Sequence, residues 1–219
     1  MDASLDRVRN VVIFRVVGSA FPLWQADPMH ESAPRPGELA AASDGRGPEP
    51  GPGGLRVERA RTPDVSAIRA LVAPYAAQRI LIAKDAVAYF EGLAEFRVAR
   101  DADTGEVLGC GALHVMWEDL AEIRTLAVAE SARGRGVGGA IVERLLADAR
   151  DVGVARVFCL TFEVDFFAAH GFGVIEGQAV EPEVYAQLLR SYDEGVAEFL
   201  DLERVKPNTL GNTRMLRIL

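Results

Sequence analysis

The stretch from Glu122 to Gly139, EIRTLAVAESARGRGVGG, constrains the fold of this chain more than any other. Its first half is typical of a buried strand, and the apolar periodicity that follows predicts a helix over Val137–Asp151. Two arginines and four glycines lie where the strand passes into the helix: Arg133, Arg135, Gly134, Gly136, Gly138 and Gly139. Free N–H groups at a helix start bind phosphates, and glycines allow close backbone approach. This pattern predicts a site for a phosphate-bearing cofactor; the alternative is a flexible turn with solvated arginines.

Two other phosphate-binding patterns fit this loop less well. Gly134-x-Gly136-x-x-Gly139 satisfies the dinucleotide fingerprint, but the residues Ala129–Ala132 separate the strand from the loop. A dinucleotide fold would also need several more strand–helix units than the rest of the chain supplies. No Lys-Ser or Lys-Thr pair follows the glycines, which excludes a P-loop. We therefore interpret the GxGxxG match as incidental.

The chain divides into two parts of different composition. Seven of its 11 prolines lie within residues 1–54, and residues 28–54 hold six prolines and six glycines. Such a segment has little apolar surface to bury, so we expect residues 1–54 to be a disordered extension. An apolar run before it, split by Arg15, is too short and too charged for a signal peptide or a membrane span. Residues 55–219 are expected to form one globular domain.

Charge and cysteine content exclude several classes of function. The formal net charge of −8 argues against wrapping nucleic acid or an anionic membrane, since both require clustered positive charge. Only Cys110 and Cys159 are present, so we expect no disulfide framework and a reducing, cytoplasmic environment. Neither these cysteines nor His114 and His170 have the spacing of metal ligands, and we predict no metal site.

The periodicity predicts a mixed α/β domain. Thr62 resembles a helix N-cap followed by proline at the first helical position. The expected strands are Leu55–Arg61, Glu95–Ala99, Val107–Val115, Ala121–Ala129, Ala155–Thr161, Phe172–Ile175 and Arg214–Ile218. The expected helices are Pro63–Ala77, Lys84–Leu93, Val137–Asp151, Val164–His170 and Pro182–Tyr192, with Gly153 as a left-handed cap.

The chain resembles the GNAT superfamily of acetyl-CoA-dependent N-acetyltransferases. Arg133-x-x-Gly136-x-Gly138 matches the pyrophosphate motif of that superfamily, and the element order over residues 55–219 matches its fold. The resemblance implies a mixed central sheet of about seven strands, flanked by helices and splayed at the acetyl-CoA cleft. It also implies acetyl-CoA as co-substrate, held by the loop and by the backbone of the preceding strand. The residues implied in cofactor binding are Leu126, Ala127, Val128, Arg133, Gly134, Arg135, Gly136, Val137, Gly138 and Gly139.

Three segments are more specifically similar to the short amino-acid N-acetyltransferases of bacterial arginine biosynthesis, which make N-acetylglutamate. These segments are 107–115, 122–128 and 198–216. The resemblance implies acetyl transfer to the α-amine of glutamate or glutamine by direct attack, as the first step of arginine biosynthesis. The alternatives are a GNAT enzyme for another amine, such as a protein N-terminus or a drug, and a non-catalytic acetyl-CoA sensor. Such a domain is compatible with a monomer or a homodimer.

Candidate acceptor-site residues lie on the strand before the loop and near the chain's end. Glu122 stands where many GNAT enzymes carry a general base for the protonated amine. Arg124 shares its face of the strand, and either grips the acceptor's carboxylate or neutralises Glu122. Lys206, Asn208 and Asn212 lie in a polar loop with groups suited to a glutamate or glutamine side chain, or to capping their own backbone.

One departure from the family pattern concerns the general acid. Many GNAT enzymes place a tyrosine in the stretch that corresponds to residues 166–172, but Phe167 stands at that position here. Tyr192, water, or no acid at all remain as alternatives, since a thiolate is a tolerable leaving group. Cys110 as an acyl-enzyme nucleophile is the weaker alternative to inert packing in an apolar strand.

Overall fold

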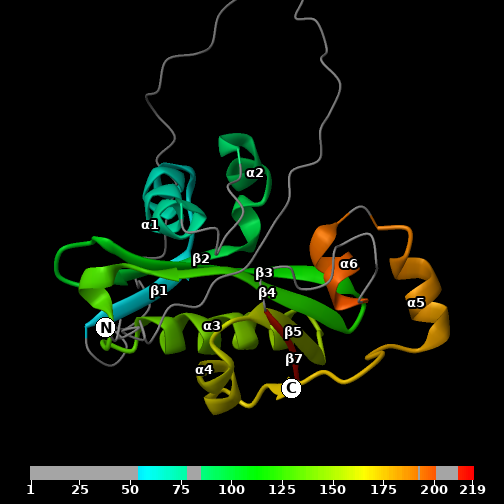
Figure 1. Ribbon diagram of the computed structural model, residues 1–219. Helices are drawn as coiled ribbons and strands as arrows, with labels where there is room; N and C mark the ends of the chain where they lie inside the picture. Colours follow the sequence, from blue (N-terminus) through cyan, green and yellow to red (C-terminus); the bar gives the residue numbers. More distant parts are fainter. Residues whose placement is uncertain (1–53, 78–84, 192, 201–211) are drawn as a thin grey trace, which may run out of the picture.

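The computed structural model describes residues 54–77, 85–191, 193–200 and 212–219. These residues form a seven-stranded sheet in the order β1-β2-β3-β4-β5-β7-β6. Strands β4 and β5 run parallel, and the other neighbouring pairs are antiparallel. Helices α1, α2 and α6 lie on one face of the sheet, and α3 and α4 lie on the other (Figure 1). The mixed, helix-flanked sheet predicted from the sequence is confirmed.

The element bounds are close to those expected. The strands are β1 (Leu55–Arg59), β2 (Phe96–Asp101), β3 (Val107–Trp117), β4 (Leu120–Val128), β5 (Arg156–Thr161), β6 (Gly173–Val174) and β7 (Thr213–Ile218). The helices are α1 (Val65–Ala77), α2 (Ala86–Glu91), α3 (Val137–Asp151), α4 (Val164–Ala169), α5 (Pro182–Leu188) and α6 (Glu194–Phe199). Gly153 has a φ of 86°, as expected of a left-handed cap.

Two predictions about helices were wrong. The predicted cap at Thr62 lies one residue too late: a short 3₁₀ turn, Thr62–Asp64, precedes α1, and the Arg61 N–H donates to the Asp64 carboxylate at 2.8 Å. The predicted helix Pro182–Tyr192 ends at Leu188, and a further helix, α6, follows it. Asp193 marks the start of α6, because its carboxylate accepts the Val196 N–H at 3.1 Å.

The predicted extension, residues 1–54, lies outside the described residues except for Gly54.

The sheet separates two apolar cores. One lies between the sheet and α3, which contributes Ile141, Leu145 and Leu146, all fully buried. The other lies under α1 and includes Ile68. Helix α3 packs tightly on β3 because β3 has a glycine at the contact: a Cβ at Gly111 would lie 2.7 Å from Ile141 Cγ2. This close packing fixes the start of α3 beside the end of β4.

The sheet opens between β4 and β5. Their parallel pairing begins at Leu120 with Arg156 and ends at Ile123 with Cys159, although both strands continue beyond that point. The remainder of β4, from Arg124 to Val128, is therefore not paired with β5. This opening corresponds to the splay that the family resemblance implied.

Candidate active site

Strand β4 changes course at a bulge beside the opening. Cys110 pairs with Ala127 and Ala112 with Arg124, so Gly111 on β3 stands opposite two residues of β4. One of these, Thr125, has a φ of 55°, which is unusual for a β-branched residue. Beyond the bulge, the Ala127 side chain enters the core under α1, and Leu126 and Val128 face the side of α3.

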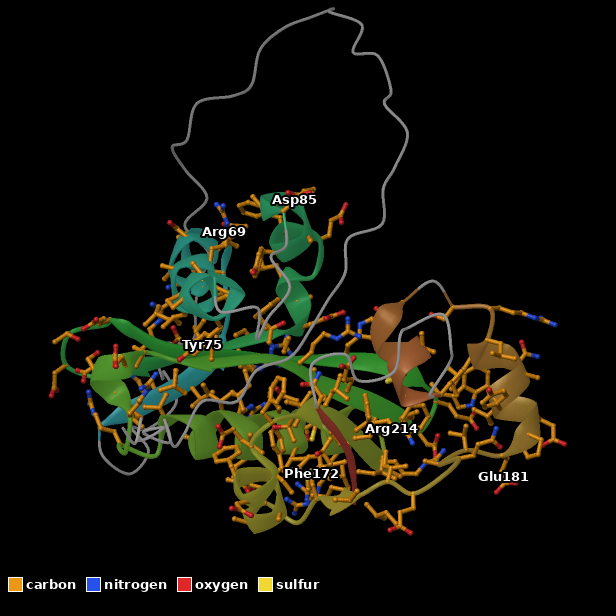
Figure 2. All side chains as sticks on the ribbon, in the orientation of Figure 1. Arg69, Tyr75, Asp85, Phe172, Glu181 and Arg214 are labelled. Atoms are coloured by element: carbon orange, nitrogen blue, oxygen red, sulfur yellow. The ribbon has the colours of Figure 1, made fainter. Side chains whose placement is uncertain are left out.

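The end of β4 is also held from the α1 side. Tyr75 lies on the side of α1 that faces the sheet (Figure 2). Its hydroxyl donates to the backbone carbonyl of Val128 at 3.0 Å, and the ring is almost fully buried. This bond satisfies the carbonyl of the last residue of β4, directly before the glycine loop.

The glycine loop forms one wall of a pocket of about 230 Å³. Gly134 and Gly136 both have a φ of 77°, and Gly136 is the N-cap of α3. A Cβ at Gly138 would lie 3.4 Å from the Phe166 ring, which lines the opposite wall. The lining residues are Leu126, Val128, Ala132, Arg133, Gly134, Gly136, Val137, Gly138, Gly139 and Phe166. Glycines thus keep open a pocket at the positive end of a 15-residue helix.

The structure brings eight of the ten predicted cofactor residues to this pocket, with Ala127 and Arg135 outside its lining. Arg135 instead donates to Asp101 at 2.9 Å, and this bond contributes most to lowering the pKa of Asp101 to about 2. Arg133 differs, because its buried Nε–H finds no acceptor among the described residues. Arg133 also contacts the exposed Glu130 from Nη1, at 3.5 Å, but of the two arginines it is the one that lines the pocket.

We expect the two arginines to contribute unequally to cofactor affinity. Replacing Arg133 with Ala should raise the KM for acetyl-CoA roughly 10- to 100-fold, since it removes a charge-assisted hydrogen bond to a phosphate. Arg135→Ala should raise it no more than about threefold, because that side chain is solvated and already paired. Steady-state kinetics with varied acetyl-CoA measures both, and equal effects would contradict this assignment.

A charged cluster lies on the α6 side of β4. Glu122 and Arg124 are buried, and Glu122 Oε2 lies 2.8 Å from Arg124 Nη2. Arg124 also donates from Nη1 and Nη2 to the two carboxylate oxygens of Asp193, at 3.2 and 3.3 Å. His114, directly opposite Glu122 on β3, contacts Glu95 Oε1 at 2.7 Å and lies 3.8 Å from Asp193. We call these five residues the charged cluster.

Contacts within the cluster shift the pKa values of Arg124 and Asp193. Burial lowers the pKa of Arg124, but the nearby carboxylates of Glu122 and Asp193 outweigh this and raise it. Burial raises the pKa of Asp193, but Arg124, His114 and the Val196 N–H together lower it below its usual value. Arg124 and Asp193 therefore form a stable ion pair. Of the two roles considered for Arg124, the ion pair with Glu122 is present; carboxylate binding stays a prediction.

The position of the expected general acid is filled by a core residue. The Phe167 ring is fully buried and packs edge-on against Phe166 and Phe172, at centroid distances of 5.3 and 5.0 Å. Phe166, not Phe167, faces the pocket. Tyr192, the alternative acid, lies outside the described residues.

The predicted acceptor loop is described only at its end. Lys206 and Asn208 lie outside the described residues. Asn212 stands directly before β7, and its buried Oδ1 accepts no hydrogen bond among the residues that the structure describes. Its role in acceptor binding stays a prediction.

The cysteines are packing residues. Both are buried and free; burial raises the pKa of Cys110 to about 12 and that of Cys159 well above its usual value. A thiol of this kind is a poor nucleophile at neutral pH, which disfavours an acyl-enzyme on Cys110. Within the described ranges, no group of three His, Cys, Asp or Glu side chains is arranged to hold a metal ion. The helices there also include none with the length and apolar character needed to cross a membrane.

The sequence analysis did not identify three residues of the charged cluster as candidate site residues: Glu95, His114 and Asp193. Asp193 had one usable signal, since an aspartate before a helical segment is a common N-cap. Glu95 and His114 had none, because their contact joins a turn after α2 to the middle of β3.

Comparison with known proteins agrees with this geometry. The profile of the acetyltransferase (GNAT) family matches residues 68–172. An amino-acid acetyltransferase from Mycobacterium tuberculosis is 58% identical over 164 residues, which cover 74% of this chain and 94% of that protein. The crystal structure of Rv2747 from the same species, in complex with CoA and NLQ, is 57% identical with a TM-score of 0.71, covering 75% of this chain and 99% of that one.

A second solved structure extends the comparison to longer enzymes. The N-acetylglutamate synthase of Neisseria gonorrhoeae, complexed with coenzyme A and N-acetyl-glutamate, is 25% identical with a TM-score of 0.60. The match covers 75% of this chain but only 35% of that protein. Fold, pocket and sequence comparisons therefore agree, and the chain belongs to the GNAT acetyltransferase family.

Proposed function

We propose that this chain transfers an acetyl group from acetyl-CoA to the α-amine of glutamate or glutamine, as the first step of arginine biosynthesis. The observation that carries the proposal is the 58% identity to an amino-acid acetyltransferase over nearly all of that protein's length. The buried carboxylate and guanidinium of Glu122 and Arg124, on the strand that leads to the phosphate-binding loop, give this chain the groups that such a reaction needs.

In the proposed mechanism, Glu122 accepts the proton of the α-ammonium, directly or through a water molecule. The freed amine attacks the thioester carbonyl, so an N–C bond forms as the C–S bond breaks; the nitrogen releases its second proton to solvent, and CoA leaves as a thiolate. The β4 backbone at the bulge and beyond, from Leu126 to Val128, supplies hydrogen-bonding groups for the pantetheine arm and the carbonyl oxygen. The start of α3 and Arg133 hold the pyrophosphate. With Phe167 in the core, we infer that solvent protonates the thiolate.

We also propose a cytoplasmic location for this reaction. Two free cysteines with no disulfide between them are typical of proteins in a reducing compartment. A cytoplasmic enzyme would have direct access to acetyl-CoA and amino acids.

The test is an assay of CoA release with acetyl-CoA and a panel of acceptors. Glutamate and glutamine should be acetylated, and mass spectrometry should locate the acetyl group on the α-nitrogen. If only other amines were acetylated, glutamate and glutamine would be ruled out as the acceptors. Binding of acetyl-CoA with no turnover on any amine would instead favour a sensor.

A further inference from the structure

The partners of Arg124 are unusual for a buried guanidinium. The Arg124 side chain is only 5% exposed and contacts two carboxylates, those of Glu122 and Asp193, although it carries one positive charge. Its Nε–H is buried and donates to no acceptor within the described part of the chain. The guanidinium thus contacts two negative charges but still has an N–H donor that a further acceptor could use.

The two carboxylates are held differently. Glu122 lies 2.8 Å from Arg124, and its side chain is 2% exposed. Asp193 makes longer contacts, at 3.2 and 3.3 Å, and its side chain is 23% exposed. Although Asp193 accepts two hydrogen bonds from Arg124, its contacts are longer than that of Glu122 and its side chain reaches solvent, so Asp193 is the carboxylate that exchanges more easily.

Asp193 also has partners to keep if it leaves Arg124. Its Oδ1 accepts the Val196 N–H at 3.1 Å, and its Oδ2 lies 3.8 Å from His114 Nε2. Leaving Arg124 would therefore not strand a buried charge, because the Val196 N–H stays bound and the 23% exposed side chain can be hydrated.

An α-amino acid suits this cluster because it brings both charges at once. A carboxylate alone would add a fourth negative group to Glu95, Glu122 and Asp193. The α-ammonium that accompanies the carboxylate offsets this, and it enters beside Glu122, which accepts its proton in the proposed reaction.

We propose that Asp193 is an internal substitute for the acceptor's carboxylate: it occupies Arg124 in the free protein and yields that place to the carboxylate of the incoming amino acid. The proposal rests on the proposed function for the nature of the acceptor. Asp193 then sets acceptor affinity, because binding must first displace a competing carboxylate.

Helix α6 has attachments that do not depend on this ion pair. Phe199 packs edge-on against Phe158 of β5, with a centroid distance of 5.1 Å. Arg214 of β7, labelled in Figure 2, donates to the Phe199 carbonyl at 2.9 Å. Asparagine is as good an N-cap as aspartate, so Asp193→Asn removes the charge and retains the start of α6.

The first measurement is steady-state kinetics of Asp193→Asn. We expect the KM for the acceptor amino acid to fall roughly 3- to 10-fold and the KM for acetyl-CoA to stay unchanged. The matched control is Asp119→Asn, which alters another two-pronged aspartate–arginine pair, with Arg156, and should leave the acceptor KM unchanged. An acceptor KM that stays the same or rises in Asp193→Asn would overturn the exchange.

Calorimetry separates this proposal from the proposed function. Glutamate or glutamine is titrated into protein saturated with CoA, which carries no acetyl group and permits no reaction. If neither amino acid binds the wild-type protein, the proposed function fails. If one binds the wild type and Asp193→Asn does not bind it more tightly, the exchange fails while the proposed function stands.

Discussion

Replacing Glu122 with Gln should lower kcat about 100- to 10,000-fold near neutral pH, the range typical for loss of a general base. Gln has nearly the same shape and keeps an oxygen that can face Arg124, so the fold should be retained. The KM for acetyl-CoA should stay unchanged, because the cofactor pocket does not include Glu122. The measurement is kcat as a function of pH, with acetyl-CoA saturating.

The pH dependence of kcat shows whether Glu122 acts as the general base. The deficit of Glu122→Gln should shrink as pH rises, because a larger fraction of the acceptor amine is then already deprotonated in solution. Glu118→Gln is the matched control: this exposed glutamate lies in the turn between β3 and β4, and its loss should leave the rate unchanged. A pH–rate profile of Glu122→Gln parallel to that of the wild type would remove Glu122 from the role of base.

The second large effect is on stability. Asp148 of α3 lies 2.7 Å from Arg97 of β2, and both side chains are 8% exposed. Asp148→Ala leaves the Arg97 charge buried without this carboxylate, and we expect a loss of about 3–5 kcal/mol in unfolding free energy. For a chain of this length, this lowers Tm by about 10 °C. Thermal or urea denaturation measures it.

Asp151 provides the control, because it stands on the same helix with its side chain 72% exposed and 3.8 Å from Arg144. Asp151→Ala should change the unfolding free energy by no more than about 0.5 kcal/mol. The double replacement Arg97→Met with Asp148→Leu should recover much of the stability, since neither buried charge remains. A loss in Asp148→Ala no larger than in Asp151→Ala would contradict the buried ion pair.

The sequence predicted features whose causes are local. The bounds of α3 were predicted residue for residue, because its apolar stripe, its glycine N-terminus and Gly153 all act within a few positions. The cofactor pocket was predicted for the same reason, since a strand, a loop and a helix that are contiguous in the chain form most of it.

Features that join distant segments were missed. Asp193 meets Arg124 across 69 positions, and no local pattern in either segment indicates this pairing. The bulge at Thr125 depends on how β3 and β4 pair, which alternation of apolar residues does not encode. The orientation of Phe166 toward the pocket and Phe167 toward the core likewise depends on how α4 packs.

The burial of both cysteines has a practical consequence for every measurement of turnover. Burial raises the pKa of the Cys110 thiol to about 12, so this thiol stays protonated at pH 8, and Cys159 is similarly buried. A disulfide reagent that reports thiols by colour should therefore react with released CoA and leave the folded enzyme untouched. The native protein should give no background signal, and unfolding should reveal two equivalents of thiol per chain.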